Sequence, residues 1–386
     1  MTPGARVAAA IEILEDIRAG QAAEQALTRW ARRSRFAGSK DRAAIRDHVF
    51  DVLRCRPLAA HYGRGETGRA LMLGLLHLQD GQIDALFSGE GHAPAPPEGT
   101  ELDFPAPPDD RATRWCLPEW LVPLFATALG DGAGDTARAL QSRAPVSLRV
   151  NLARIDRGAA QALLAEQGVE TALNPATDAA LTVTKGERRI RNAPAYADGL
   201  VELQDAASQA VVAALPGGGR VLDYCAGGGG KALALAMDPA RVVLAHDIDP
   251  RRMSDLPARA ARAGASIRQV GTEDLAQAGP YDVVLCDAPC SGSGAWRRAA
   301  EGKWTLTPDR LADLTAIQDG ILDAACGLVA PGGTLAFATC SVLREENEDR
   351  SAAFLARHPE WACGFERRFP VDAAGDGFYT AHFKRV

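Results

Sequence analysis

The stretch that decides the fold runs from Gly219 to Lys231 and reads GRVLDYCAGGGGK. Its first part is an apolar run that predicts a strand, and the glycines that follow open a predicted helix. Glycine allows a backbone to turn tightly and to approach a ligand closely. The stretch therefore predicts a strand, a ligand-binding turn and a helix in sequence.

Further strands and helices alternate along the chain after this stretch. Apolar runs at 242–248 (VVLAHDI), 281–290 (YDVVLCDAPC) and 332–341 (GGTLAFATCS) predict strands, and 308–329 predicts a long helix. Such alternation predicts an α/β fold with a mostly parallel sheet covered on both faces. Ligands bind outside the carboxyl ends of such strands. The residues found at those ends are Cys225 with its glycines, Asp247, Asp287, Cys290 and Cys340.

The glycine run admits three interpretations. A phosphate-binding P-loop is excluded, because Cys225 and Ala232 occupy places that need Gly and Ser or Thr. A nucleoside-binding loop fits, since Gly227, Gly229 and Ala232 match G-x-G-x-x-A and Asp247 follows at the spacing of a ribose-binding acid. Either a nicotinamide cofactor or S-adenosylmethionine offers that ribose. The third interpretation is a purely structural turn.

The cysteines divide by position. Asp287 and Cys290 lie three residues apart just beyond a predicted strand, and Cys340 ends another, so they could converge on one cleft. Cys286 and Cys326 lie inside apolar segments and suit the core. Eight cysteines without a C-x-x-C pair, and seven scattered histidines, indicate neither a disulfide framework nor a metal site. We therefore expect a reducing, cytoplasmic compartment.

Residues 1–80 are predicted to be all-α, with helices over 5–19, 39–54 and 71–79 and a cap at Ser39. Residues 81–110 form a proline-rich acidic linker or long loop. Residues 111–200 are predicted to be a helical segment followed by a small α/β module, in which 181–186 and 187–192 suggest strands. Residues 201–386 form the α/β domain. No stretch is apolar enough to cross a bilayer, and a monomer is the default expectation.

Charge is unevenly distributed over the 386 residues. The chain as a whole carries a net charge of −6, with 47% hydrophobic and 24% charged residues, which is typical of a globular protein. Residues 28–56, however, carry nine Lys or Arg against three Asp, whereas 80–110 carry eight acids and no base. Whole-chain charge therefore does not exclude binding to nucleic acid, which depends on local patches.

DAPCSGSG at 287–294, followed by FATCS at 337–341, resembles the RNA cytosine-C5 methyltransferases of the bacterial ribosomal-RNA and NOL1/NOP2/Sun family. CAGGGGK, KWTLTPDRL, SVLREENE and DGFYTAHFKR follow the family's order, as do APVSLRVN and ELQDAASQ. SKDRAAIRDHVFDVLR resembles the NusB-like domain of its small-subunit ribosomal-RNA members. The resemblance implies a Rossmann-like methyltransferase domain, a NusB-like RNA-binding domain at 1–80 and S-adenosylmethionine as cofactor.

The resemblance also implies a role for each matching residue. Cys340 would be the nucleophile, Asp287 would hydrogen-bond the cytosine near N3, and Cys290 would assist removal of the C5 proton. The cofactor would be held by the following residues: Cys225, Ala226, Gly227, Gly228, Gly229, Gly230, Lys231, Asp247, Arg252, Asp274 and Asp287. The product would be 5-methylcytosine, formed through a covalent adduct between cysteine and C6.

The chain departs from the family at two points. Gly228 stands where most members have proline, which predicts a more mobile loop. Thr272 stands at the nearest match to the acid that contacts adenine, with Glu273 and Asp274 just after it, and Asp274 is the residue chosen for that contact. The expected substrate is 16S ribosomal RNA, free or in a small-subunit assembly intermediate. The alternatives are transfer RNA as substrate, a non-catalytic RNA-binding assembly factor, and a nicotinamide-dependent oxidoreductase.

Overall fold

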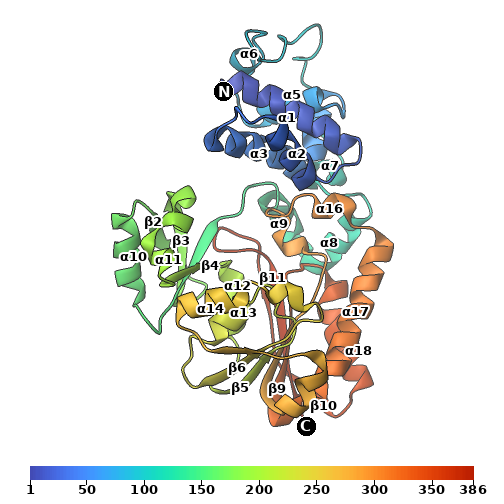
Figure 1. The fold of residues 1–386 in the computed structure, drawn as a ribbon. Coiled ribbons are helices and arrows are strands. Elements are labelled where there is room, and N and C mark those ends of the chain that lie inside the picture. The colour runs from blue at the N-terminus through green and yellow to red at the C-terminus, as the bar shows by residue number, and fades with distance from the viewer. The chain divides into compact units, whose positions relative to one another are not determined.

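The structure is a computed structural model that describes residues Met1–Val386. It divides into two compact units (Figure 1). The first comprises Met1–Arg143 with Trp296–Thr305, and the second comprises Ala144–Ala295 with Leu306–Val386. A compact unit can hold more than one domain. The domain boundaries proposed after residues 80, 110 and 200 therefore stay predictions.

The first unit is entirely helical, as predicted for its N-terminal part. Ser39 is not the cap of its helix but the first helical residue, because Gly38 is the N-cap and its N–H is taken by the carboxylate of Asp41. No helix of the protein is both long and apolar enough to cross a bilayer. The helices of this unit are α1 (Pro3–Arg18), α2 (Ala23–Arg33), α3 (Ser39–Arg54), α4 (Arg56–Gly63), α5 (Gly68–Leu78), α6 (Ile83–Leu86), α7 (Arg111–Trp115), α8 (Leu121–Leu129), η1 (Gly130–Gly132), α9 (Ala133–Ala139) and α16 (Gly302–Thr305).

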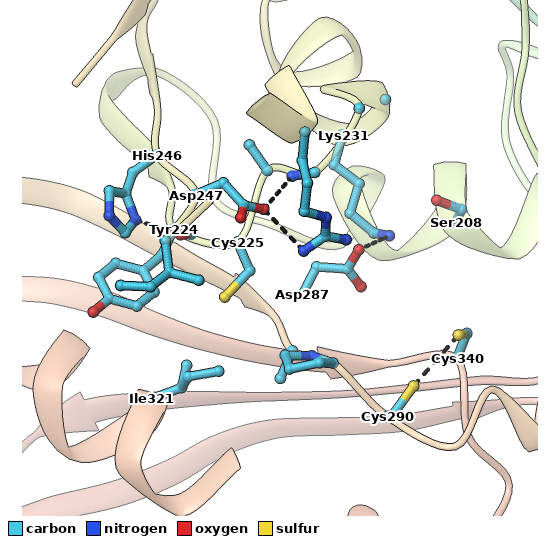
Figure 2. Close-up of a pocket in the computed structure, with 18 of the residues that line it drawn as sticks. Ser208, Tyr224, Cys225, Lys231, His246, Asp247, Asp287, Cys290, Ile321 and Cys340 are labelled. Atoms are coloured by element: carbon cyan, nitrogen blue, oxygen red, sulfur yellow. Dashed lines mark hydrogen bonds and ion pairs between the residues drawn. The ribbon is translucent and has the colours of Figure 1, made fainter. Parts of the chain in front are cut away.

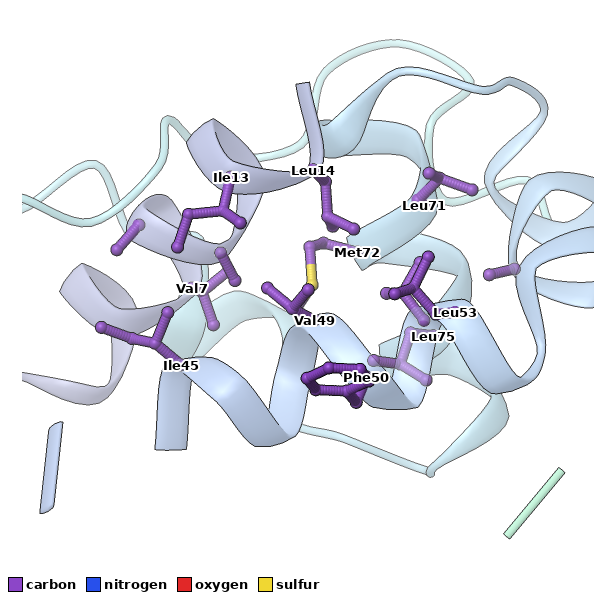
Figure 3. Packing of buried hydrophobic residues seen from close by; sticks show 14 of the residues in the cluster. Val7, Ile13, Leu14, Ile45, Val49, Phe50, Leu53, Leu71, Met72 and Leu75 are labelled. Atoms are coloured by element: carbon purple, nitrogen blue, oxygen red, sulfur yellow. The ribbon is translucent and has the colours of Figure 1, made fainter. Parts of the chain in front are cut away.

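The core of this unit lies between α1, α3 and α5 (Figure 3). Val7, Ile13, Ile45, Val49 and Met72 are completely buried in it. Burying an aliphatic side chain of this size stabilises a fold by about 1.5–3 kcal/mol. The stability of the unit therefore rests on these apolar faces, and the charged outer face of α2 and α3 is left free to vary.

The proline-rich segment has no helix or strand between residues 87 and 110. It is held against the helical unit by side chains of α5 and the α4 end. Arg69 forms an ion pair of 2.7 Å with Glu101 and donates to the carbonyl of Ala95 at 3.0 Å. Arg64 donates to the carbonyl of Asp103 at 2.8 Å. The segment is thus a long loop fixed by hydrogen bonds at several points.

The second unit begins with a small antiparallel sheet of order β2-β3-β1-β4. The prediction of a strand at 187–192 is wrong, because Gly186 at φ +87° turns the chain out of β3 and a 3-10 helix follows. The elements of this part are β1 (Val146–Val150), α10 (Arg157–Glu166), β2 (Glu170–Leu173), β3 (Ala180–Lys185), η2 (Glu187–Asn192), α11 (Pro194–Ala197) and β4 (Val201–Leu203).

A seven-stranded sheet of order β10-β11-β9-β8-β5-β6-β7 forms the rest of the unit. The predicted α/β class is confirmed, since β9, β8, β5, β6 and β7 pair in parallel, and only β11 runs antiparallel to its neighbours β9 and β10. The elements are α12 (Ala206–Ala213), β5 (Gly219–Asp223), α13 (Gly230–Leu235), β6 (Arg241–Ala245), η3 (Pro250–Met253), α14 (Leu256–Ala263), β7 (Ile267–Gln269), η4 (Thr272–Asp274), α15 (Leu275–Ala278), β8 (Tyr281–Asp287), η5 (Ser293–Ala295), α17 (Pro308–Cys326), β9 (Val329–Thr339), η6 (Arg344–Glu346), α18 (Glu348–Arg357), β10 (Trp361–Phe369) and β11 (Phe378–Arg385).

Both faces of this sheet are covered. Val283 and Leu285 of β8 pack in one core with α12, α13 and α14, whereas Val284 and Cys286 pack in the other with α17 and α18. Side chains of a strand point alternately to the two faces of the sheet. A strand such as β8, which is buried on both faces, therefore has to be apolar throughout. Because β5, β6, β8 and β9 are parallel, their carboxyl ends lie at the same edge of the sheet, and the turns that follow them lie together there.

Candidate active site

The candidate site is a cavity at the carboxyl ends of β5, β6, β8 and β9 (Figure 2). Its volume of about 620 Å³ is in the range of small-molecule sites. Most of the residues predicted from the sequence line it, namely Cys225, Ala226, Gly227, Gly228, Gly230, Lys231, Asp247, Arg252, Asp287, Cys290 and Cys340. The topology thus brings together segments that are up to 115 residues apart, from 225 to 340.

Two predicted residues lie elsewhere. Gly229 is the N-cap of α13 at φ +78°, and a Cβ there would lie 2.4 Å from Leu256, so the turn itself requires glycine. Asp274 is an exposed residue of η4 that does not line the cavity, and neither does Thr272. Thr272 instead bonds through Oγ1 to Nε2 of His246, at 3.0 Å, and it is the His246 ring that lines the cavity.

Asp247 closes the glycine turn from the next strand. Its buried Oδ2 accepts from the N–H of Gly227 at 2.9 Å and from Arg252 at 3.1 Å. Its Oδ1 accepts from the N–H of Asp249 at 3.0 Å. Three donors therefore fix the carboxylate at the cavity wall, where a ribose would present its hydroxyls in a nucleoside-binding fold.

Two arginines hold the carbonyls of the same turn. Arg149, buried in β1, donates to the carbonyl of Gly230 at 2.9 Å, and Arg259 of α14 donates to that of Gly228. Burial lowers the pKa of Arg149 to about 10, so it remains charged at neutral pH. The turn has glycine at 228 in place of the expected proline, but guanidinium groups from two other elements restrain its backbone.

Asp223 at the end of β5 is a buried carboxyl that lacks a partner. It is completely inaccessible to solvent, and neither oxygen has a hydrogen bond apart from a weak interaction with the N–H of Ala232. Burial, and next the charge of Asp287, raise its pKa to about 7. Asp223 does not line the cavity, but the carboxylates of Asp247 and Asp287 do. S-adenosylmethionine carries an ammonium, a sulfonium and a ribose, and two carboxylates beside a glycine turn fit those groups.

Two thiols face each other across the lower wall of the cavity. The Sγ atoms of Cys290 and Cys340 are 3.4 Å apart (Figure 2). The hydrogen bond to Cys340, followed by burial, raises the pKa of Cys290 well above its usual value. A thiolate at Cys290 is therefore disfavoured, and the hydrogen bond between the two sulfurs can have either one as its donor.

A lysine and an aspartate form an ion pair beside these thiols. Nζ of Lys231 lies 2.6 Å from Oδ2 of Asp287 and 5.1 Å from the ring centre of Phe378. Burial lowers the pKa of Lys231, but the neighbouring carboxylate of Asp287 outweighs it and the pKa is raised. The negative charge of Cys340 acts in the same direction. Lys231 is thus an ammonium group that interacts with both an acid and a thiol of the site.

The loops that carry the two thiols are joined by a buried carboxylate, that of Glu346. It accepts from the N–H of Ser291 at 2.7 Å, from the hydroxyl of Ser341 at 2.5 Å and from Nε2 of Gln318 at 3.2 Å. The hydroxyl of Ser291 is a fourth donor. Ser291 follows Cys290 and Ser341 follows Cys340 in sequence, so one side chain fixes both cysteine-bearing turns.

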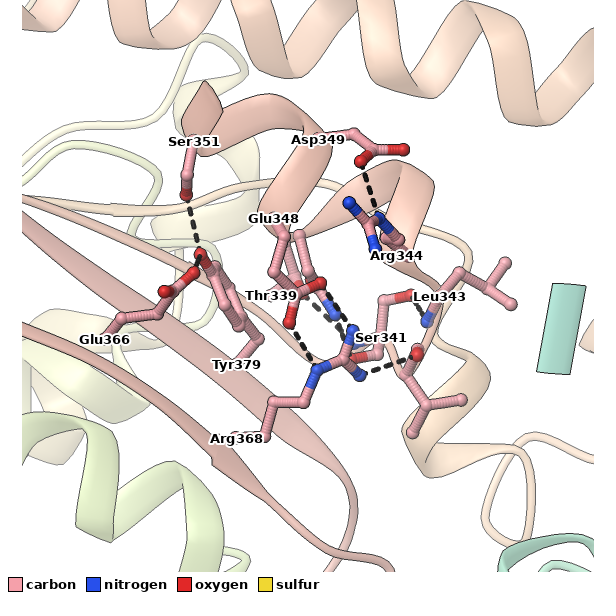
Figure 4. A network of polar contacts seen from close by, with 12 residues as sticks. Thr339, Ser341, Leu343, Arg344, Glu348, Asp349, Ser351, Glu366, Arg368 and Tyr379 are labelled. Atoms are coloured by element: carbon pink, nitrogen blue, oxygen red, sulfur yellow. Dashed lines mark hydrogen bonds and ion pairs between the residues drawn. The ribbon is translucent and has the colours of Figure 1, made fainter. Parts of the chain in front are cut away.

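Further polar contacts hold the turn after β9 from its other side (Figure 4). The side chain of Asn347 accepts from the hydroxyl of Thr339 at 2.5 Å and donates to the carbonyl of Ser341 at 3.0 Å. Arg368 of β10 donates to the carbonyl of Val342 at 2.8 Å and pairs with Glu348. The antiparallel edge strand therefore braces the turn that presents Cys340.

Comparison with known sequences places this geometry in a family. Residues 210–384 match the family model described as 16S rRNA methyltransferase RsmB/F, and residues 117–188 match the ferredoxin-like domain described for RsmF/B-like methyltransferases. The ribosomal RNA small subunit methyltransferase B of Klebsiella pneumoniae subsp. pneumoniae is 35% identical over 289 residues, covering 70% of this chain and 67% of that protein. The Salmonella typhi enzyme of the same name is 35% identical over 284 residues, covering 69% and 66%. This chain spans about two thirds of their length.

Solved structures share the fold. The crystal structure of PH0851 matches with a TM-score of 0.77 at 22% identity, over 100% of this chain and 99% of that one. A methyltransferase homolog from Pyrococcus horikoshii matches with a TM-score of 0.61 at 23% identity, over 71% of this chain and 97% of that one. At these identities the similarity supports the fold alone, and the match to PH0851 extends it to the N-terminal part. The chemistry has to be inferred from the residues of the site.

Proposed function

The chain belongs to the family of 16S rRNA methyltransferases RsmB/F, whose cofactor is S-adenosylmethionine, and on that premise we propose that it forms 5-methylcytosine in small-subunit ribosomal RNA. The observation that carries the proposal is the pair of thiols 3.4 Å apart, beside an ion pair of 2.6 Å and a glycine turn. Methylation of a ring carbon needs a nucleophile and a proton acceptor. A methyltransferase acting on an exocyclic amine or a ribose hydroxyl would need neither thiol.

Cys340 is proposed as the nucleophile. Cytosine C5 reacts poorly with a methyl sulfonium, but addition of a thiolate at C6 makes C5 enamine-like, which splits one difficult step into two. The raised pKa of Cys290 disfavours a thiolate at that position. The ammonium of Lys231 adds a favourable charge interaction with the Cys340 sulfur. The electrostatics thus favour Cys340 over Cys290 as the thiolate.

Asp287 is proposed to bind the cytosine ring near N3. Its Oδ2 is held by Lys231, so its orientation is fixed before a base enters. When sulfur adds to C6, electron density moves to N3, which takes up a proton and returns it when the S–C6 bond breaks. A carboxyl at that edge can relay this proton and accept a hydrogen bond from the N4 amino group, and the ammonium of Lys231 offsets the negative charge of the site. The base has to leave any stack to reach these groups, as in other enzymes that modify bases.

Cys290 is proposed to act after methyl transfer. Its pKa is high in the free protein mainly because of the hydrogen bond to Cys340. That cause disappears once the Cys340 sulfur is bonded to C6, so the pKa of Cys290 falls. Cys290 then loses its own proton to solvent and, as a thiolate, takes up the C5 proton. Loss of this proton lets the S–C6 bond break, which regenerates the Cys340 thiolate and releases 5-methylcytosine.

The bound cofactor supplies the methyl group as an electrophilic sulfonium. The residues proposed to hold it are the turn from Cys225 to Lys231, Asp247 at the ribose and Arg252 behind Asp247. Contacts of Gly229 and Asp274 with the cofactor are not part of the proposal, because neither residue lines the cavity.

The decisive experiment combines a cellular and a purified system. Bisulfite sequencing of 16S rRNA from cells with and without the gene should reveal one cytosine that loses protection when the gene is absent. The purified chain with methyl-labelled S-adenosylmethionine should then label a 16S rRNA transcript, or a small-subunit assembly intermediate, at that cytosine. Unchanged 16S rRNA together with a lost 5-methylcytosine in transfer RNA would move the substrate to transfer RNA. Absence of label in either RNA, despite cofactor binding, would favour a non-catalytic assembly factor.

Replacing Asp247 by asparagine is expected to weaken S-adenosylmethionine binding by at least about 10-fold, since a charged hydrogen-bond acceptor contributes about 1.5–3 kcal/mol. Asn lacks the charge that pairs with Arg252 and offers one acceptor where the carboxylate has two. Titration calorimetry measures the affinity. Asp249→Asn is the matched control, because Asp249 is two residues away but pairs with Arg251 and does not line the cavity. Equal affinities in the two variants would remove Asp247 from the cofactor site.

Glu346→Gln is expected to lower kcat by about 10- to 100-fold, because at least one charge-assisted bond of about 1.5–3 kcal/mol to the cysteine turns is broken. The affinity for S-adenosylmethionine should stay unchanged, since Glu346 does not contact the glycine turn. Glu345→Gln is the matched control: Glu345 adjoins Glu346, but its buried Oε2 has no hydrogen-bond partner. A parallel loss of kcat and cofactor affinity in Glu346→Gln would indicate general damage to the fold instead of positioning of the thiols.

A further inference from the structure

The two thiols of the cavity lie close enough to bond to each other. The Sγ atoms of Cys290 and Cys340 are 3.4 Å apart, whereas the two sulfurs of a disulfide are about 2.05 Å apart. A movement of about 1.4 Å therefore separates this arrangement from a covalent bond. Both residues are partly exposed and line the cavity, so a small oxidant can reach them from solvent (Figure 2).

The backbone around the thiols is compatible with such a bond. Cys290 and Cys340 follow β8 and β9, which are neighbouring parallel strands. Neighbouring strands are about 4.8 Å apart, within the range of about 4.4–6.8 Å found between the Cα atoms of a disulfide. The N–H of Gly294 donates to the carbonyl of Cys340 at 2.9 Å, which keeps the first turn beside the second. Bond formation therefore requires rotation of the side chains and little movement of the backbone.

Glu346 prevents the two turns from separating. Its carboxylate accepts from the N–H of Ser291 at 2.7 Å and from the hydroxyl of Ser341 at 2.5 Å. These serines directly follow Cys290 and Cys340 in the chain. Groups held together in this way react with each other far faster than free groups do, because little translational or rotational freedom is left to lose. The two thiols are thus arranged for a reaction with each other.

The two sulfurs differ in their expected reactivity toward an oxidant. A thiolate reacts with peroxides, whereas a protonated thiol reacts far more slowly. The ammonium of Lys231 interacts favourably with a negative charge on Cys340. In contrast, the hydrogen bond between the two sulfurs, and next burial, raise the pKa of Cys290. Cys340 is therefore the sulfur expected to be oxidised first, with the Cys290 thiol beside it.

We propose that a hydroperoxide converts Cys290 and Cys340 into a reversible disulfide that switches methyl transfer off. The Cys340 thiolate first attacks a peroxide oxygen, so that an S–O bond forms and the O–O bond breaks. The leaving hydroxide takes up the proton that the Cys340 thiol had lost. The Cys290 sulfur then attacks the Cys340 sulfur, and the oxygen departs as water with the Cys290 proton. Two thiols and one hydrogen peroxide thus give one disulfide and two water molecules.

The disulfide has two consequences for the site. Neither sulfur can add to C6 or accept the C5 proton while the S–S bond exists, so the loss of activity rests on the proposed function, whereas formation of the bond does not. A cysteine oxidised without a neighbouring thiol proceeds to a sulfinic acid, which is irreversible. Cys290 instead stops the oxidation of Cys340 at a stage that a dithiol reverses. The pair thus inactivates the site under peroxide and preserves its nucleophile.

The test is treatment of the full-length chain with a small excess of hydrogen peroxide, followed by intact-mass measurement and peptide mapping under non-reducing conditions. The wild type should lose about 2 Da, the mass of the two hydrogens removed, and yield a cross-linked peptide that contains Cys290 and Cys340. Methyl transfer should fall in proportion to the cross-linked fraction and return with dithiothreitol. The affinity for S-adenosylmethionine, measured by calorimetry, should stay unchanged, because the glycine turn takes no part in the disulfide.

Two variants separate the thiol pair from the other cysteines. Cys290→Ala should form no cross-link, and its Cys340 should gain about 32 Da as a sulfinic acid that dithiothreitol does not reduce. Cys363→Ala is the matched control, because Cys363 is an exposed thiol of β10 that does not line the cavity. This control should be cross-linked, inactivated and reactivated as the wild type is.

The proposal fails if the wild-type chain accumulates a sulfinic acid at Cys340 without the cross-link, or if dithiothreitol does not restore its activity. It also fails if Cys363→Ala keeps its activity under peroxide, since the exposed thiol would then be the sensor. The reduced chain tests the proposed function separately. Cross-linking in a chain that never methylates RNA would contradict the proposed function and leave the disulfide standing, whereas methyl transfer without cross-linking would contradict the disulfide alone.

Discussion

Replacing Cys340 by alanine is expected to abolish methyl transfer, with a loss of at least about 10³-fold, which is typical when a nucleophile is removed. The loss should fall entirely on kcat. Cys340 does not touch the glycine turn, so the affinity for S-adenosylmethionine should remain that of the wild type. The measurement is transfer of a labelled methyl group from the cofactor to 16S rRNA under single-turnover conditions, alongside a calorimetric titration of the cofactor.

Cys363→Ala provides the control for loss of a thiol as such. Cys363 is exposed on β10, and its Sγ bonds to the carbonyl of Phe365 within its own strand, at 3.3 Å. This variant should retain full activity. Activity of Cys340→Ala within about 10-fold of the wild type would show that the nucleophile is another group, with Cys290 the next candidate because it is 3.4 Å away.

The alternation of strands and helices after residue 219 predicted the parallel sheet, and the positions of the chemical groups at strand ends predicted their convergence. Both predictions rest on periodicity along the chain, which a single sequence displays. The antiparallel pair β10 and β11 was not predicted, because an edge strand such as β10 has only two buried residues, at its ends. Without burial, a strand shows no apolar pattern.

The residues that hold the turns of the site in place were harder to predict from the sequence than the residues expected to react. Glu346 lies 55 positions after Ser291 in the chain and meets it only because β8 and β9 are neighbours. Arg149 reaches the turn at Gly230 from a different sheet. No local pattern marks either residue, since a buried polar side chain is defined by partners that the fold brings to it.

The expected contact with adenine was chosen by residue type alone. Asp274 was chosen because it is an acid near the expected place in the sequence, yet its side chain is exposed and away from the cavity. His246, which does line the cavity, lies next to Asp247 and is held by the carbonyl of Tyr224 at 2.7 Å and by Thr272 at 3.0 Å. Burial and hydrogen bonding, which decide whether a residue lines the cavity, cannot be read from residue type in the sequence.

The second large effect is expected for Cys290→Ala, which should trap the enzyme on its RNA. If Cys290 assists only after methyl transfer, its removal leaves addition of Cys340 and transfer of the methyl group intact but stalls the loss of the C5 proton. Multiple turnover should fall by at least about 100-fold, the usual contribution of a general base. A protein–RNA species that survives denaturation should accumulate, and its amount should approach one per enzyme molecule.

The electrostatics of the free protein make the order of events testable. Because the hydrogen bond to Cys340 is the main cause of the high pKa of Cys290, alanine at 290 removes that thiol–thiol contact without removing the Lys231 ammonium that interacts with the Cys340 sulfur. Formation of the adduct should therefore remain fast while its resolution is slow. The double variant Cys290→Ala/Cys340→Ala should form no such species, because the sulfur that bonds to C6 is absent. A denaturation-resistant complex in the double variant would contradict Cys340 as its origin, and rapid release of methylated RNA by Cys290→Ala would show that another group removes the proton.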